Sequence, residues 1–182
     1  MKGIIFKILE DFVVRTSGEV AWEELLDATE LATSEPFIGP GDYPVDDLLA
    51  LANTYCVHTG DEINELLTRF GRHAFPLLLR TVPNISHNIR TPKDLLERLD
   101  SLIHTEVRKL HPAADTPQIS FLDTGPDSGT IRYVSERRLC PIARGLIDGL
   151  AHSYGKQVEQ DETECMRNGA DACEIHLRFA SA

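Results

Sequence analysis

Three residues with hydrogen-bonding side chains occupy alternate positions, Tyr133, Ser135 and Arg137. On a β-strand, alternate residues point to one face, so a phenol, a hydroxyl and a guanidinium would project together over roughly 13 Å. All three groups donate hydrogen bonds, and the guanidinium matches the geometry of a carboxylate. The spacing predicts either a row that binds a ligand with one or two carboxylates or a solvated strand face.

A single histidine, His104, lies at the edge of an apolar helical stripe between Thr91 and Leu110. Its ring could point into a cavity beside the core, where neutral imidazole is a good ligand for iron or zinc. A histidine at such an edge is more often half exposed and inert. Spacing alone leaves both interpretations open.

Three of the four cysteines, Cys140, Cys165 and Cys173, form another candidate group. The last two flank the segment MRNGADA, whose Gly169 favours a tight turn that would bring the thiols together. Three thiolates and one further donor make a structural zinc site, but the spacing is not that of a known zinc finger, so buried thiols are the alternative. Cys56 stands alone in an apparent helix and is expected in the core.

Composition limits the classes of function. A chain of 182 residues, 42% of them hydrophobic, predicts one domain over residues 1–182. The net charge of −11 disfavours binding to nucleic acid or to an anionic membrane surface. The N-terminus lacks the pattern of a signal peptide, and no apolar run approaches the roughly 18 residues of a membrane span, so we expect a cytoplasmic protein.

Helical patterns dominate residues 1 to about 111. They lie around residues 4–13, 22–26, 45–55, 61–75 and 91–110. Gly18 is expected to end the first helix, Asp61 to cap the fourth, and Pro76 to kink or restart it. Thr91 followed by proline gives the fifth helix a clear start.

From residue 112 onward the pattern is mixed. Runs at 118–122 and 130–135 around a turn at 125–129 predict an antiparallel hairpin, and further strands are expected at 157–162 and 172–179. A helix predicted over 139–154 separates these two pairs of strands. The fold class is therefore α+β, with an N-terminal helical half packed on a C-terminal four-stranded antiparallel sheet that contains an inserted helix.

Four stretches resemble, in this order and over nearly the full length, the bacterial haem-nitric oxide/oxygen-binding (H-NOX) domains, relatives of the haem domain of soluble guanylate cyclase. They are MKGIIF at 1–6, LIHTEVRKL at 102–110, RYVSERRLC at 132–140 and CMRNGADAC at 165–173. The Y-x-S-x-R row is the signature of that family, and the proximal histidine of the family falls on His104. The sequence is thus similar to that of a gas-sensing haem domain.

The resemblance implies a non-covalent haem b between the helical half and the sheet. Tyr133, Ser135 and Arg137 would bind its two propionates, and His104 would be the single protein ligand to iron. The opposite side of the iron would stay open for a diatomic gas. Pro117 resembles the family proline that presses on the porphyrin and distorts it.

The positions that align with the distal wall are all apolar. They are Ile5, Leu9, Ala74, Leu78, Ile142 and Leu146. Family members that bind oxygen stably carry a tyrosine where this chain has Ile142. Without that donor, bound oxygen loses a hydrogen bond of the order of 1–3 kcal/mol, whereas NO does not depend on one. The resemblance therefore implies a ferrous haem that binds NO and CO and excludes oxygen.

The resemblance also implies how a signal would leave the domain. NO weakens the iron bond on the opposite side, so it can release His104 and shift the helical half against the sheet half. The domain would be a sensor, not an enzyme, and would regulate a histidine kinase or a cyclic-di-GMP enzyme in trans. A peroxidase is disfavoured, because in the apolar distal region His73 is the only candidate acid or base.

Some family members hold zinc with three cysteines and a histidine. Cys140, Cys165 and Cys173 match the cysteines, whereas Glu162 stands where the histidine is expected. A Cys₃Glu zinc site and free thiols that respond to oxidation both remain open. The alternative function is a thiol or zinc redox sensor in which the cysteines carry the signal.

Overall fold

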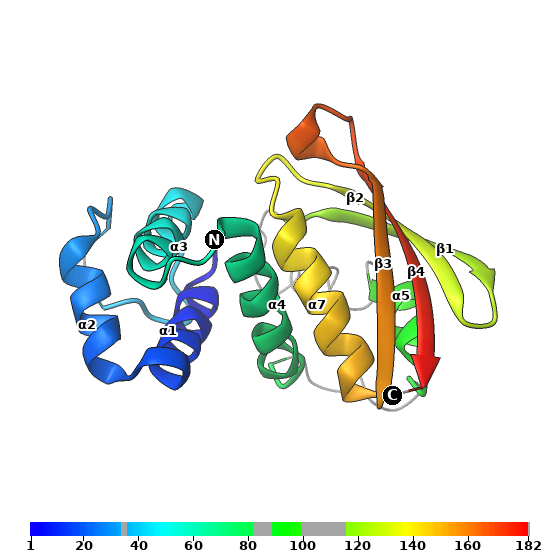
Figure 1. Cartoon of the computed structure of the whole chain (residues 1–182), viewed down its shortest axis with the longest axis horizontal. Coiled ribbons are helices and arrows are strands. Elements are labelled where there is room, and N and C mark those ends of the chain that lie inside the picture. Colours follow the sequence, from blue (N-terminus) through cyan, green and yellow to red (C-terminus); the bar gives the residue numbers. More distant parts are fainter. Residues whose placement is uncertain (34–35, 82–88, 100–115, 182) are drawn as a thin grey trace.

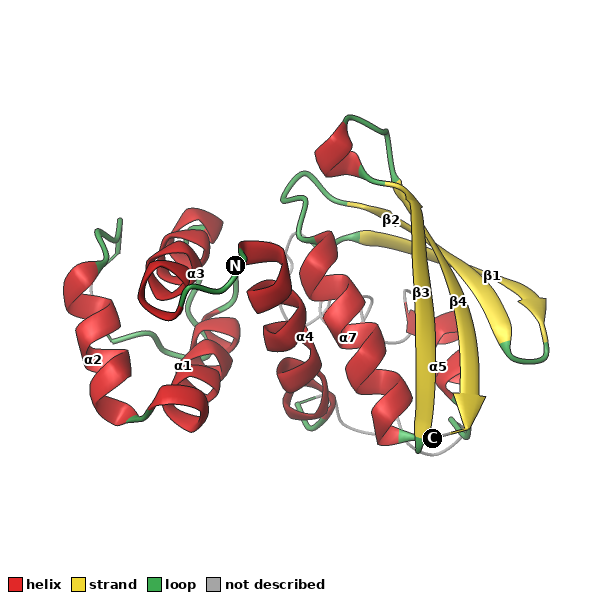
Figure 2. Cartoon of the chain, in the orientation of Figure 1, coloured by secondary structure: helices red, strands yellow, loops and turns green. Residues whose placement is uncertain are grey.

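The structure, a computed structural model, describes residues 1–33, 36–81, 89–99 and 116–181. Its elements are α1 (Gly3–Ser17), α2 (Glu19–Ala28), α3 (Val45–Thr59), α4 (Ile63–Leu79), α5 (Pro92–Arg98), β1 (Gln118–Gly125), β2 (Ser128–Val134), α7 (Cys140–Ser153), β3 (Lys156–Glu164), the short helix η3 (Met166–Asn168) and β4 (Cys173–Ser181). Helices come first and the sheet second, with α7 inserted between its two pairs of strands (Figures 1 and 2). The predicted α+β class is confirmed. Among the described helices, none has the length and apolarity needed to cross a membrane.

Helices α1 to α4 surround a first hydrophobic core. Each contributes an apolar stripe, so that Phe6 of α1, Trp22 of α2, Leu51 of α3 and Phe70 of α4 are all buried in it. Gly18 ends α1 as predicted, with a φ of 95°, a value that residues with a Cβ rarely adopt. Burial of these stripes holds the four helices together.

The start of α4 differs from the prediction. Glu62, not Asp61, caps the helix, because its carboxylate accepts hydrogen bonds from the backbone N–H groups of Asn64 and Glu65. Asp61 instead accepts a hydrogen bond from Arg69 at 2.9 Å. Either acid could supply a cap, so the sequence alone did not distinguish the two.

The sheet is antiparallel, with the strand order β1-β2-β4-β3. Both predicted strand pairs are present, but the hairpin strands extend further than predicted, to Gly125 and from Ser128, so its turn is tighter. Apolar residues on β2 and β4, among them Ile131, Ile175 and Leu177, face α7 and α5 in a second core. The period-two pattern of β4 gave the orientation of its side chains correctly.

Helix α5 belongs by its packing to the sheet. The Thr91 side chain caps it in a capping box with Asp94, and Leu95 and Leu96 are buried in the second core. The Lys93 ammonium donates to Asp123 of β1 at 2.6 Å. The rest of the helix predicted to reach Leu110, including His104, lies outside the described residues.

Close contact between α4 and α7 joins the two parts of the fold (Figure 1). A Cβ at Gly71 would lie 2.3 Å from the Ile142 carbonyl oxygen, and one at Gly145 would lie 2.0 Å from that of Thr68. The two backbones can approach this closely only because both residues lack a side chain. The helices are thereby fixed against each other with little space between them.

Candidate functional site

Tyr133 lies near the end of β2, between Ile119 of β1 and Cys173 of β4. The residue is 4% exposed. Burial raises the pKa of its phenol, while hydrogen bonds with the Ser135 side chain and the Leu139 backbone offset part of that effect. The phenol is therefore protonated near neutral pH and available as a hydrogen-bond donor.

The prediction that the three signature residues share one strand face is wrong. β2 ends at Val134, and the chain then turns to reach the start of α7. The Arg138 N–H closes this turn on the Ser135 carbonyl at 3.0 Å, and Arg138 has a left-handed φ of 50°. The Arg137 N–H donates to Ser135 Oγ at 3.3 Å. A strand end and a turn, not a continuous strand, therefore carry the three signature residues.

The Arg137 side chain is half-buried and extends toward the N-terminus. Its Nη1 lies 4.0 Å from Met1 Sδ, although 136 positions separate the two residues. The Met1 ammonium donates in turn to the Tyr43 carbonyl at 2.6 Å. The guanidinium thus lies where the turn before α7 meets the N-terminus.

The six predicted distal-wall residues form one cluster. Leu9 and Ala74 are buried in the first core, and the other four, Ile5, Leu78, Ile142 and Leu146, are partly buried against it. They come from α1, α4 and α7, so residues about 140 positions apart in the chain pack into the same core. None of the six side chains carries an N–H or O–H donor. The cluster can line a site for an apolar group but offers it no side-chain hydrogen bond.

Pro117 is half-buried and directly precedes β1. His73, in contrast, does not belong to the apolar cluster. Its Nε2 donates to Asp11 at 2.7 Å, which ties the ring to α1. The candidate acid or base that the sequence offered for the distal region is therefore engaged in a hydrogen bond to α1.

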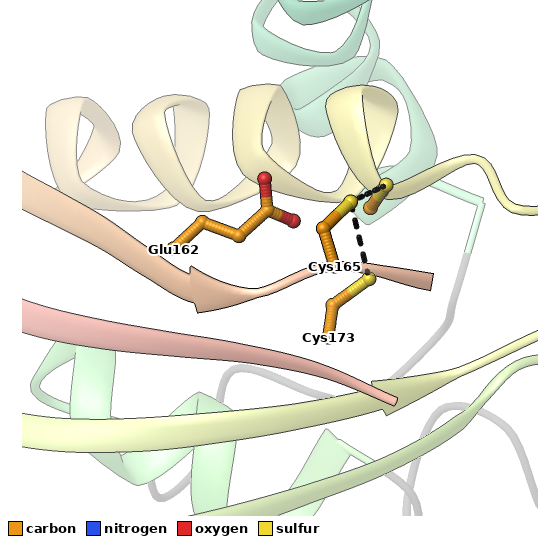
Figure 3. A group of neighbouring side chains, drawn as sticks. Glu162, Cys165 and Cys173 are labelled. Carbon is orange, nitrogen blue, oxygen red and sulfur yellow. Dashed lines mark hydrogen bonds between the residues drawn. The ribbon is translucent and has the colours of Figure 1, made fainter. Parts of the chain in front are cut away.

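The three predicted cysteines meet at the N-terminal end of α7 (Figure 3). Cys140 begins α7, Cys165 precedes η3 and Cys173 begins β4. Cys165 Sγ lies 3.6 Å from the sulfur of Cys140 and 3.9 Å from that of Cys173. Gly169, with a φ of 97°, forms the predicted turn between the last two. All are free thiols, since these distances far exceed the roughly 2.05 Å of a disulfide.

Glu162 of β3 completes a group of four possible metal donors. One carboxylate oxygen and the three sulfurs all lie within 4.8 Å of one another, and the carboxylate points toward the thiols (Figure 3). Thiolates bound at about 2.3 Å to a tetrahedral zinc ion lie about 3.8 Å apart, which agrees with the observed spacing. The Glu162 Oε1 is buried and has no hydrogen-bond partner among the described residues. This donor set fits a zinc ion.

Burial keeps the thiols of Cys140 and Cys173 protonated when no metal is bound. Burial raises the pKa of both Cys140 and Cys173. The Met166 N–H donates to Cys173 Sγ at 3.3 Å, which opposes the shift at that thiol. A bound cation would favour the thiolate over the thiol, because a metal ion binds the thiolate form.

Two residues near these sites were not anticipated from the sequence. Arg144, one turn after Cys140 on α7, lies 3.8 Å from Glu162, and its Nε is buried without a partner in the described chain. Met166 contributes the N–H donor to Cys173 and also accepts the Ser135 N–H at 3.5 Å. The i, i+4 spacing could have pointed to Arg144, whereas only the fold reveals Met166.

Comparison with known proteins gives one family. The model of haem-NO-binding domains matches residues 2–162. The H-NOX protein from S. oneidensis in the Fe(II)NO state has a TM-score of 0.92 at 28% identity, over 100% of both chains. The H-NOX domain from Shewanella oneidensis in the Fe(II)CO state has a TM-score of 0.89 at 28% identity, again over 100% of both chains. The unliganded Fe(II) H-NOX protein from K. algicida shares the fold, with a TM-score of 0.89 at 23% identity over 100% of this chain and 98% of that chain. No curated protein sequence matches.

Fold and matched sequence define a domain of the haem-based gas-sensor class. The chain belongs to the haem-NO-binding family, as the resemblance of its motifs predicted.

Proposed function

We propose that this protein senses NO at a ferrous haem b, binds CO as well, excludes oxygen, and regulates a signalling partner in trans without being an enzyme. The NO-bound and CO-bound states of the S. oneidensis H-NOX structures support the proposed binding of both gases. The observation that carries the proposal is that all six predicted distal-wall residues belong to, or pack against, one apolar core and carry no side-chain donor. The partner class, a histidine kinase or a cyclic-di-GMP enzyme, rests on the family resemblance alone.

The residues present fit a haem. Its macrocycle is apolar, which suits the apolar side chains from α1, α4 and α7. Its two propionates are anionic, which suits the phenol of Tyr133, the hydroxyl of Ser135 and the half-buried guanidinium of Arg137. When bound, haem supplies a ferrous iron that takes a diatomic gas at its open face. Pro117 would press on the porphyrin, and His104 would hold the iron from the side opposite the cluster.

Exclusion of oxygen follows from the side chains of the cluster. Oxygen at iron is polarised and is retained by a hydrogen-bond donor, which none of the six side chains supplies. His73 does not take this role, since its imidazole pairs with Asp11. NO and CO bind without such a donor.

The signal would leave through the bond between His104 and iron. His104 follows α5 in the sequence, and α5 packs against the sheet through Leu95 and Leu96, whereas Leu9 and Ala74 belong to the helical core. Rupture of that bond by NO would shift the helical half against the sheet half.

Absorption spectra of the full chain loaded with hemin test this function. The reduced protein is expected to change its spectrum with CO and with NO but not in air, apart from slow oxidation. His104→Gly should alter the reduced spectrum, and added imidazole should restore it. A stable oxygen complex, or a His104→Gly protein with an unchanged spectrum, would contradict the proposal.

A second function is supported by the cluster of Cys140, Cys165, Cys173 and Glu162. We propose that it holds one structural zinc ion, as Cys₃Glu, in a sensor whose signal comes from haem. The alternative, that oxidation of the thiols carries the signal, predicts that Cys→Ser variants lose partner regulation while their NO spectra stay normal.

A further inference from the structure

An open cleft of about 320 Å³ runs along the seam between α4 and α7. Arg69, Arg72 and His73 of α4 line it together with His152 and Ser153 of α7. Every ionisable residue in this lining is basic. The cleft is thus a concentration of positive charge on a protein whose net charge is −11.

Two of the four basic residues already have acidic partners. Arg69 donates to Asp61 at 2.9 Å, and His73 donates to Asp11 at 2.7 Å. Burial alone would raise the pKa of Asp11, but hydrogen bonds from Arg15 and His73 lower it below its usual value. These two pairs fix the side of the cleft nearest α1 and neutralise part of its charge.

The other two basic side chains, those of Arg72 and His152, differ from these pairs. Among the residues described, no carboxylate forms an ion pair or hydrogen bond with the side chain of Arg72 or of His152. Both side chains are exposed and approach the cleft from different helices. The guanidinium and the imidazole together offer several N–H donors to one anion, whereas the Ser153 hydroxyl donates to the Gly149 carbonyl at 2.8 Å.

The cleft lies apart from the proposed gas site. Arg69, Arg72 and His73 recur at spacings of three and four and share one face of α4, whereas Ala74 and Leu78 fall on another face. The lining comes from both α4 and α7, which Gly71 and Gly145 hold in close contact. An anion in the cleft would therefore bridge the helical part and the sheet part at a fixed seam.

We propose that this cleft binds a phosphate-type oxyanion, either free phosphate or the phosphate group of a small phosphate ester. The tetrahedral oxyanion accepts several hydrogen bonds at once, which suits donors converging from two helices. A concave site of this volume admits a small ligand. The inference goes beyond the proposed function and does not depend on haem.

Calorimetric titration of the full chain in phosphate-free buffer, with inorganic phosphate and with AMP as probes, tests this site. We expect saturable binding to one site per chain, weakened about tenfold or more by Arg72→Gln and by His152→Gln. Arg80→Gln is the matched control, because it removes the same charge from an exposed position at the end of α4 outside the cleft. Thermal unfolding should shift upward with the probe in the unsubstituted chain and in Arg80→Gln only.

Comparison of the probes identifies the source of the anion. Tighter binding of AMP than of phosphate points to a phosphate ester, and equal binding points to free phosphate. The proposal is overturned if neither probe saturates, or if Arg80→Gln weakens binding as much as Arg72→Gln. It is also overturned if only an acidic peptide binds through Arg72 and His152, because the cleft then docks a protein.

Discussion

The Sγ atoms of Cys140 and Cys165 lie 3.6 Å apart, although 25 positions separate the two residues in the chain. One begins α7 and the other follows β3, so the contact forms only when helix and sheet are packed together. Cys173 approaches from β4 within 3.9 Å of Cys165. The fold thus places three thiols at the spacing of a tetrahedral metal site and leaves Glu162 to complete it.

Zinc content is the first prediction. Full chain purified without chelator should contain about one zinc per chain, because three thiolates and a carboxylate complete a tetrahedral site. Cys165→Ser should reduce the content well below one, measured by elemental analysis. Cys56→Ser is the control, since Cys56 lies outside the cluster. Equal zinc in both variants would place the metal elsewhere.

The stability of metal-free protein should fall as the pH rises past 9. Burial raises the pKa of Cys140 and Cys173 above the ordinary 9.0, so the unfolded chain releases protons there while the folded chain retains them. The free energy of unfolding should then fall by up to about 1.4 kcal/mol per pH unit for each thiol. The slope fades below pH 9 and is absent from these thiols near neutral pH.

Urea unfolding between pH 8 and 10 measures this effect. Cys140→Ala should flatten the slope, and zinc-loaded protein should lack it, since bound metal keeps the thiolates in the folded state. The phenols of Tyr133, which is buried, and of Tyr154, which is half-buried, act in the same direction only from their ordinary pKa of 10.0 upward. A slope identical in the Cys140→Ala protein would assign the titration to another group.

Much of the fold could be predicted from the sequence, because local signals agreed with the final packing. Gly18, the Thr91 cap and the alternation on β4 each carry their structural information within a few residues. The signature row was misplaced because β propensity does not show where a strand ends. Val134 is the last strand residue, and the turn at Arg138 is set by the need to start α7.

The residues of the candidate site could be predicted, but their arrangement in space could not. The family resemblance supplied its residues, while the chain alone did not show that α1, α4 and α7 bring them together. The contact of Arg144 with Glu162 depends on how α7 packs on β3, which no local pattern encodes. Tertiary neighbours of this kind are beyond the reach of spacing arguments.

Gly145→Ala should destabilise the fold by about 1–3 kcal/mol, because its Cβ would lie 2.0 Å from the Thr68 carbonyl oxygen and would force α4 and α7 apart. Urea unfolding gives the difference. Gly39→Ala is the matched control, since a Cβ there meets no atom within 4 Å. If both variants are equally stable, the close approach of the two helices is not rigid.

Loss of haem tests the roles of Tyr133 and Arg137. Removing one charge-assisted hydrogen bond to a propionate costs about 1.5–3 kcal/mol, so Arg137→Gln should release haem about tenfold faster or more to a high-affinity acceptor. Tyr133→Phe removes a neutral donor and should have a smaller effect in the same direction. Arg132→Gln, an exposed neighbour paired with Glu174, serves as control. Equal rates in all three variants would remove these residues from the haem site.

Oxygen binding should appear when a donor is introduced at position 142. Ile142 is half-buried near the start of α7 and belongs to the apolar cluster with Leu78, so a tyrosine there can direct its hydroxyl into the same space. A hydrogen bond to polarised oxygen stabilises it by about 1.5–3 kcal/mol, enough to raise oxygen affinity about tenfold or more.

The matched control is Ile142→Phe, which adds a ring of similar size without the hydroxyl. Absorption spectra of the reduced proteins in air should show a persistent oxygen-bound form for Ile142→Tyr and none for Ile142→Phe, while both still bind CO. If neither variant retains oxygen, the phenol does not reach the gas, and Ile142 is not part of the distal wall. If both retain it, the size of the ring and not its donor controls the ligand, so the hydrogen-bond argument for excluding oxygen fails.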